Sequence, residues 1–195
     1  MQRGGDGCVL NEVCKHSYLR DIDICDIDNM VIDLSKKHFS WNQGWNDKRV
    51  TVYNQDASKY IKETNKKYSI VIMDSSDPFD GMVAEALYTD DFFNDIYNIL
   101  DDDGIFCFQS ECIFVSKELI KKWRNFLLKK FKYVYYGNIN VPTYPCGQIG
   151  MMLCSKKYDP RKINNINNVD ISKLEYYNKD IHNSSFILPN FYKLN

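Results

Sequence analysis

The chain has 195 residues, of which 44% are hydrophobic and 26% are charged, and its formal net charge is −1. This length predicts a single domain, and the apolar fraction is large enough to bury a core, which excludes wholesale disorder. The balanced charge argues against a nucleic-acid-binding protein. The apolar runs are far shorter than the ~20 residues of a membrane span, and no basic start followed by an apolar stretch indicates a signal peptide.

The cysteine pattern bears on the compartment and on metal binding. Seven cysteines are scattered without a CxxC pair, and the chain has only three histidines. This pattern favours neither a disulfide framework nor a zinc site. Most of the cysteines lie in apolar, strand-like runs, so we expect small core residues in a reducing compartment, and hence a cytoplasmic protein.

Short apolar runs alternate with longer amphipathic stretches. In chain order the pattern predicts a strand at 21–27, a helix at 31–39, a strand at 49–53, a helix at 57–63, a strand at 68–73, a helix at 91–100, a strand at 105–109, a helix at 117–130 and a strand pair at 133–138 and 148–154. The β-branched run Tyr68–Met73 is typical of a strand buried on both faces. The acidic stretch Asp101–Gly104 is expected to form a turn between a helix and the next strand.

This alternation is typical of βαβ units, which predicts an α/β fold with a mostly parallel sheet and helices on both faces. Lys156–Val169 is expected to be a surface loop around the run Asn164–Asn168. The tail Tyr176–Phe191 mixes aromatic and polar residues and is expected to pack back on the domain.

The beginning of the sequence departs from the expected order of elements. A glycine-rich turn, Gly4-Gly5-Asp6-Gly7, comes after only three residues. Such a loop usually follows a buried first strand. We therefore expect either a fragment or a sheet that lacks its usual central strand. The turn alone is also compatible with an ordinary tight turn.

Carboxylates follow the predicted strands at one kind of position. In an open α/β sheet the carboxyl ends of the strands line a single crevice, where ligands bind. A crevice with so many carboxylates favours a cation, or a ligand rich in hydroxyl and amine donors. The side chains expected to converge there are Asp6, Asp26, Asp56, Asp74, Asp77 and Glu111.

Two of these positions leave alternatives open. An acid about 20 residues beyond a glycine turn fits a ribose diol acceptor, but Asp26 could also be a strand-end surface acid. The stretch Asp74–Pro78 (DSSDP) aims two carboxylates at the same space, with Pro78 fixing the turn. Its alternative is an Asx turn that caps a helix.

Taken together, the motifs resemble the spermidine synthases of the polyamine aminopropyltransferase family. The resemblance extends from Gly4 to Phe191. The matching pieces are GGDG at 4–7, DICDID at 23–28, DKRV at 47–50, QDASKY at 55–60, DSSDP at 74–78, QSEC at 109–112, PTYPCGQIG at 142–150, YYNKDIH at 176–182 and LPNF at 188–191.

The resemblance implies a Rossmann-like fold of the class I methyltransferase type. It implies one catalytic domain over 1–195 that is incomplete at its N-terminus, without the family's N-terminal β domain and first strand. The implied reaction transfers an aminopropyl group from decarboxylated S-adenosylmethionine to putrescine, giving spermidine and methylthioadenosine. It implies no metal or redox cofactor, only small-molecule substrates, no nucleic acid or membrane partner, and a homodimer when full length.

The resemblance also implies roles for individual residues. On the donor side, Asp26 would accept the ribose hydroxyls, Asp56 the adenine amino group and Asp6 the propyl amine. On the acceptor side, Asp77 and Tyr144 would orient the attacking amine, and Asp74, at the junction, would be the general base. The remaining implied contacts are Gly5, Ile27 and Ala57 for the donor, and Gln109 and Glu111 for the acceptor.

Some positions depart from the family pattern. Arg3 and Cys8 replace outer glycines of the turn, Phe114 stands where tryptophan is usual, and the stretch Phe79–Glu85 is about two residues longer than usual. Two other functions therefore stay open. One is a putrescine N-methyltransferase on the same fold, and the other is a degenerate paralogue or fragment without catalysis.

Overall fold

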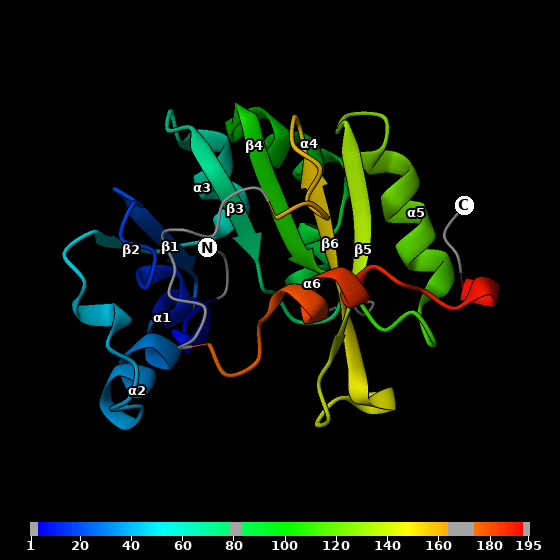
Figure 1. The fold of residues 1–195 in the computed structure, drawn as a ribbon. Coiled ribbons are helices and arrows are strands. Elements are labelled where there is room, and N and C mark those ends of the chain that lie inside the picture. Colours follow the sequence, from blue (N-terminus) through cyan, green and yellow to red (C-terminus); the bar gives the residue numbers. More distant parts are fainter. Residues whose placement is uncertain (1–3, 79–82, 164–173, 193–195) are drawn as a thin grey trace.

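A computed structural model describes residues 4–78, 83–163 and 174–192. Arg3, the start of the Phe79–Glu85 stretch and the run Asn164–Asn168 lie outside these residues. The helices and strands alternate as expected for an α/β fold (Figure 1). In chain order they are α1 (Cys8–Cys14), β1 (Ile22–Asp26), α2 (Asn29–His38), β2 (Val50–Asn54), α3 (Ala57–Glu63), β3 (Tyr68–Met73), α4 (Asp90–Ile99), β4 (Leu100–Gln109), α5 (Lys117–Leu127), β5 (Tyr133–Asn140), β6 (Gln148–Ser155) and α6 (Lys179–Ser185).

The strands form two sheets, a parallel pair and a four-stranded sheet of mixed direction. β1 pairs with β2 in parallel, and the four other strands have the order β3-β4-β6-β5. β3 and β4 are parallel, whereas β6 is antiparallel to both of its neighbours. β3, β4 and β5 therefore share one direction, and the carboxyl ends of β3 and β4 lie at the same edge of the sheet.

A break separates β1 from β3. Within the described ranges no strand lies between them, although the two strands face each other (Figure 1). Side chains from both sides, including Cys25, Ile61 and Val71, line a pocket in the break. At one end the Tyr68 hydroxyl donates a hydrogen bond to Asp23 Oδ2 over 2.7 Å. The break agrees with the expected sheet that lacks its central strand.

The predicted burial of β3 on both faces is wrong. Ser69 and Ile70 are exposed, Ile70 to 44%, and only Met73 at the end of the strand is fully buried. β3 has a described neighbour on one side, β4, and borders the break on the other. A parallel strand is buried on both faces only when neighbouring strands and helices cover it.

The predicted turn at 101–104 does not precede the strand: β4 begins at Leu100, and these residues form an irregularity within it, because Tyr68 pairs with Leu100 and Ile70 pairs with Ile105. Neighbouring groups compensate the acidic side chains: Ser69 Oγ donates to Asp101 Oδ2 over 3.1 Å, and Lys157 Nζ lies 3.9 Å from Asp103 Oδ2. These contacts partly offset the negative charge of the run.

The helix α1 was not among the predicted elements. Leu10 on α1 is fully buried and packs against Ile22 and Ile24 of β1. On the other face of β1, Cys25 packs in the same cluster as Ala57 and Tyr60 of α3. Helices therefore cover both faces of β1, as the α/β expectation requires.

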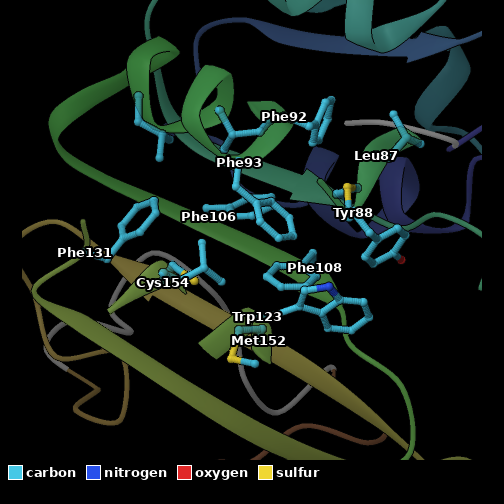
Figure 2. Packing of buried hydrophobic residues seen from close by; sticks show 14 of the residues in the cluster. Leu87, Tyr88, Phe92, Phe93, Phe106, Phe108, Trp123, Phe131, Met152 and Cys154 are labelled. Carbon is cyan, nitrogen blue, oxygen red and sulfur yellow. The ribbon is translucent and has the colours of Figure 1, made fainter. Parts of the chain in front are cut away.

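The main core lies between β4 and the helices α4 and α5 (Figure 2). The rings of Phe106 and Phe108 stack with centroids 4.9 Å apart, and Phe93 of α4 lies 5.2 Å from Phe108. Trp123 of α5 meets Phe108 edge-on at 6.0 Å. Aromatic contacts of this kind add to the stabilisation from burial. The core therefore holds β4, whose end carries Gln109, in a fixed position.

The C-terminal tail packs back on the domain, as expected. Phe186, at the end of α6, meets the Tyr135 ring of β5 edge-on at 6.3 Å. Within the described ranges, no helix is long and apolar enough to cross a membrane.

Candidate functional site

The glycine turn lies against the carboxyl end of β1. The Gly5 N–H donates to Asp26 Oδ2 over 3.0 Å, and the Asn42 side chain donates to the Asp6 carbonyl over 3.1 Å. Gly7 has φ 74°, a conformation that residues with a Cβ rarely adopt. These contacts place Asp6 at the strand ends.

Asp26, at the end of β1, forms hydrogen bonds with the glycine turn and with the residue that caps α2. It is 6% exposed, and besides the Gly5 N–H its carboxylate accepts the Asp28 N–H on Oδ1 over 2.9 Å. Each carboxylate oxygen has two acceptor sites, so Asp26 can bind a ligand hydroxyl in addition to these N–H groups. Asp26 therefore fixes the turn and remains able to act as a ligand acceptor.

Asp6 and Asp74 lie within electrostatic reach of each other across the break. Asp74 follows β3, and although it is exposed to solvent, surrounding protein atoms remove part of its hydration. This loss of hydration raises the pKa of Asp74, and the negative charge of Asp6 raises it further. A carboxylate with a raised pKa is a stronger base than an ordinary one.

A second group of polar side chains joins the turn after β3 to the end of β4. Gln109 Nε2 donates to Asp77 Oδ1 over 3.0 Å. Glu111 is 9% exposed, and burial together with the charge of Asp77 raises its pKa to about 7. Glu111 has φ 62°, and two donors, Tyr136 Oη at 2.9 Å and the Gly150 N–H at 3.0 Å, hold its carbonyl.

The other predicted site residues lie as follows. Asp56 caps α3, where Oδ1 accepts the Ser58 N–H over 2.8 Å, and its charge reaches Cys25, whose pKa is raised mainly by burial and further by Asp26 and Asp56. Ala57 is buried and lines the pocket in the break. Ile27 and Tyr144 are both exposed, to 54% and 46%.

The structure thus brings some of the predicted residues into two groups, which do not include Ile27, Asp56, Ala57 and Tyr144. One consists of Gly5, Asp6, Asp26 and Asp74, and the other of Asp77, Gln109 and Glu111. The pocket in the break is a separate feature, because its lining includes Ala57 but none of these carboxylates. In the part of the chain that the structure describes, no group of three or more His, Cys, Asp or Glu side chains could hold a metal ion.

Three residues that hold site residues in position were not predicted from the sequence. Asn42 holds the glycine turn, Tyr136 holds Glu111, and the Tyr88 hydroxyl donates to Gln109 Oε1 over 3.0 Å. Each acts across 21 or more residues of sequence, so no local pattern signals it.

The raised pKa of Glu111 predicts a stability that depends on pH. A carboxyl whose folded pKa lies above its unfolded value of 4.5 stabilises the fold below pH 4.5, and this contribution is lost as the pH rises towards about 7. Between pH 4.5 and about 7, the unfolding free energy of the wild type should therefore fall by about 2–3 kcal/mol more than that of Glu111→Gln. Urea unfolding at several pH values measures it. The exposed Glu118→Gln is the control, and equal pH profiles for wild type and Glu111→Gln would refute the expectation.

Known proteins are similar to this chain in sequence and in fold. Residues 3–166 match the spermine/spermidine synthase domain. Spermine synthase of Arabidopsis thaliana is 38% identical over 96% of this chain and 55% of its own length, and spermidine synthase 1 of Datura stramonium is 38% identical over 97% and 65%. The chain thus spans little more than half to two thirds of the length of these relatives.

Solved structures agree with this similarity. A crystal structure of a spermidine synthase in complex with the transition-state analogue AdoDATO superposes with a TM-score of 0.85 at 29% identity, over 97% of this chain and 66% of that one. Human methyltransferase-like protein 13, in complex with SAH, is 22% identical over 78% of this chain and 68% of that one, with a TM-score of 0.62, which shows a shared fold.

Proposed function

Because the chain belongs to the spermine/spermidine synthase family, we propose that it transfers an aminopropyl group from decarboxylated S-adenosylmethionine to putrescine. The observation that carries the proposal is the gathering of carboxylates after the strands, with Asp6 held by the glycine turn against Asp26 and within electrostatic reach of Asp74, and with Asp77 near Glu111. Both substrates are cations, and a negatively charged crevice attracts them.

The first group, together with Ile27, Asp56 and Ala57, binds the donor. Asp26 accepts the ribose hydroxyls beside the Gly5 N–H, with Ile27 next to it. Asp56 accepts the adenine amino group, next to Ala57. Asp6 binds the ammonium group of the propyl chain, which places the sulfonium carbon near Asp74. The contact between Gly5 and Asp26 and the proximity of Asp6 to Asp74 support this assignment.

The second group binds the acceptor amine and prepares it for attack. Asp77, Gln109, Glu111 and Tyr144 hold the diamine, one end of which must lose a proton before it can react. Asp74 takes this proton, and the lone pair left on the amine nitrogen then attacks the methylene beside the sulfonium. The new C–N bond forms as the C–S bond breaks, and the electrons of the C–S bond leave on sulfur as neutral methylthioadenosine. Holding the two substrates in this geometry contributes a large part of the acceleration.

Product analysis tests the reaction. The protein is incubated with putrescine and either decarboxylated S-adenosylmethionine or S-adenosylmethionine, and products are separated by chromatography. Spermidine and methylthioadenosine, formed only with the decarboxylated donor, are expected. Methylputrescine from the second donor would support an N-methyltransferase instead, and no product from either would support a protein without catalysis.

The substitution Asp26→Asn tests the donor site. The amide nitrogen of asparagine is a donor, so one of the two contacts to Gly5 and Asp28 becomes unfavourable and one acceptor for the ribose is lost. We expect the dissociation constant of methylthioadenosine to rise about 10- to 100-fold, the value of one or two hydrogen bonds to a charged group. Isothermal titration measures it, with the melting temperature as a check on folding. An unchanged dissociation constant would remove Asp26 from the donor site.

The cytoplasmic location and the homodimer stay predictions. Sedimentation of the purified protein tests the second of them.

A further inference from the structure

Tyr88 is a buried tyrosine whose hydroxyl is directed towards the second group of site residues. It is 9% exposed, and its ring stacks on Trp123 at 5.0 Å and meets Phe108 edge-on at 6.2 Å (Figure 2). The hydroxyl donates to Gln109 Oε1 over 3.0 Å and approaches the Gln109 carbonyl at 3.3 Å. The aromatic core therefore fixes the ring, and the ring fixes the direction of the hydroxyl.

A chain of two hydrogen bonds runs from Tyr88 through Gln109 to Asp77, and its donors and acceptors can be assigned. An ionised carboxylate only accepts hydrogen bonds, so Gln109 must present Nε2 to Asp77, over 3.0 Å. This leaves Oε1, an acceptor, for the Tyr88 hydroxyl. Tyr88 and Asp77 together thus fix both ends of the Gln109 amide in a single orientation.

We infer that Tyr88 is a positioning residue for the amine acceptor, which acts through Gln109 to keep the Asp77 carboxylate turned towards a bound alkylammonium group. The inference rests on the proposed function, because it gives Asp77 the task of orienting the amine. Tyr88 does not touch the substrate in this arrangement. Its effect is on the geometry and the charge of the pair formed by Asp77 and Glu111.

Loss of the hydroxyl has two consequences. Gln109 Oε1 loses a donor in a buried place, so the amide can rotate and turn its oxygen towards the carboxylates. The amine is then held less well, and the contact by which Gln109 lowers the pKa of Glu111 is weakened. The first consequence appears in kinetics, and the second appears in a titration that needs no substrate.

The experiment compares Tyr88→Phe with wild type and with a matched control, Tyr60→Phe. Tyr60 is also buried, and its hydroxyl donates to a carboxylate, Asp23 Oδ2 at 3.1 Å, beside the pocket in the break. With Tyr88→Phe we expect the KM for putrescine to rise about three- to tenfold, the value of one hydrogen bond, with a smaller change in kcat. Tyr60→Phe should leave the KM at the wild-type value.

Two further measurements separate positioning from a general structural effect. In a Gln109→Ala background, Tyr88→Phe should change the KM no further, because Tyr88 acts through Gln109. In proteins labelled with ¹³C at the glutamate carboxyls, the signal of Glu111, identified by its loss in Glu111→Gln, should titrate at higher pH in Tyr88→Phe than in wild type and Tyr60→Phe.

The outcomes distinguish this inference from the proposed function. An unchanged KM together with an unchanged Glu111 titration in Tyr88→Phe would overturn the inference, and so would a rise of the KM that persists in the Gln109→Ala background. If wild type turns over no amine, the proposed function fails. The Glu111 titration then decides alone whether Tyr88 positions the pair.

Discussion

Replacement of Asp74 by asparagine is expected to lower the rate of aminopropyl transfer by about 10²- to 10⁴-fold, the usual cost of losing a general base. Asparagine keeps the shape of the side chain but cannot take a proton from the ammonium group of the acceptor, which therefore stays unable to attack. The raised pKa of Asp74, which comes from partial loss of hydration and from the charge of Asp6, makes it a better base than an ordinary surface aspartate. Binding of methylthioadenosine should survive, because Asp26 and Asp56 are proposed to bind its ribose and adenine, away from Asp74.

Single-turnover rates at saturating substrate, beside isothermal titration with methylthioadenosine, measure both quantities. Both variants are made in a protein whose wild-type form, with Asp74, has been shown to turn over substrate. Asp77→Asn is the matched control, and it should raise the KM for the amine more than it lowers the single-turnover rate. Near-normal single-turnover rates for Asp74→Asn across neutral pH would exclude Asp74 as the base and would make Asp77 the next candidate.

Most of the fold could be predicted because the strongest patterns are local. The bounds of α3 and β3 agree with the predicted ranges 57–63 and 68–73, since a capping aspartate begins the first and a β-branched run forms the second. α1 was missed although Leu10, Val13 and Cys14 have helical spacing and Asp6 accepts the Cys8 N–H near the start of the helix.

Predictions failed where neighbours in space outweighed the local pattern. The run Asp101–Gly104 has the composition of a turn, yet it is an irregular part of β4, where Ser69, Lys157 and Tyr158 approach its carboxylates. β3 reads as a fully buried strand, yet part of it is exposed because it borders the break. Such effects depend on contacts over 30 or more residues of sequence, which a single sequence does not reveal.

The candidate site shows the same division. The order of carboxylates after the strands was enough to predict that Asp6, Asp26 and Asp74 gather at one edge. The left-handed conformation of Glu111 and its raised pKa depend on Tyr136, Gly150 and Asp77, which come from other elements. Local sequence thus predicted which carboxylates lie at the strand ends, whereas tertiary contacts set their orientation and raise the pKa of Glu111.

Gly7→Ala is expected to destabilise the fold by about 3–5 kcal/mol, because backbone strain and overpacking add there. Gly7 has φ 74°, and a Cβ at this position would meet the Asn42 amide and lie 2.5 Å from Trp45 Nε1. Both neighbours would have to move, and Asn42 would lose its contact with the Asp6 carbonyl. The turn that holds Asp6 beside Asp74 would loosen, so binding of the donor should weaken together with stability.

Gly147→Ala separates the two causes. Gly147 has nearly the same backbone conformation, φ 69°, but an added Cβ would meet nothing within 4 Å. It therefore carries the cost of the left-handed backbone alone, about 1–2 kcal/mol. Urea unfolding of both variants measures the difference, which is the part due to Asn42 and Trp45. Equal destabilisation by the two substitutions would show that the glycine turn has room for a side chain. Close packing of Asn42 against Gly7 would then not explain the position of Asp6 at the strand ends.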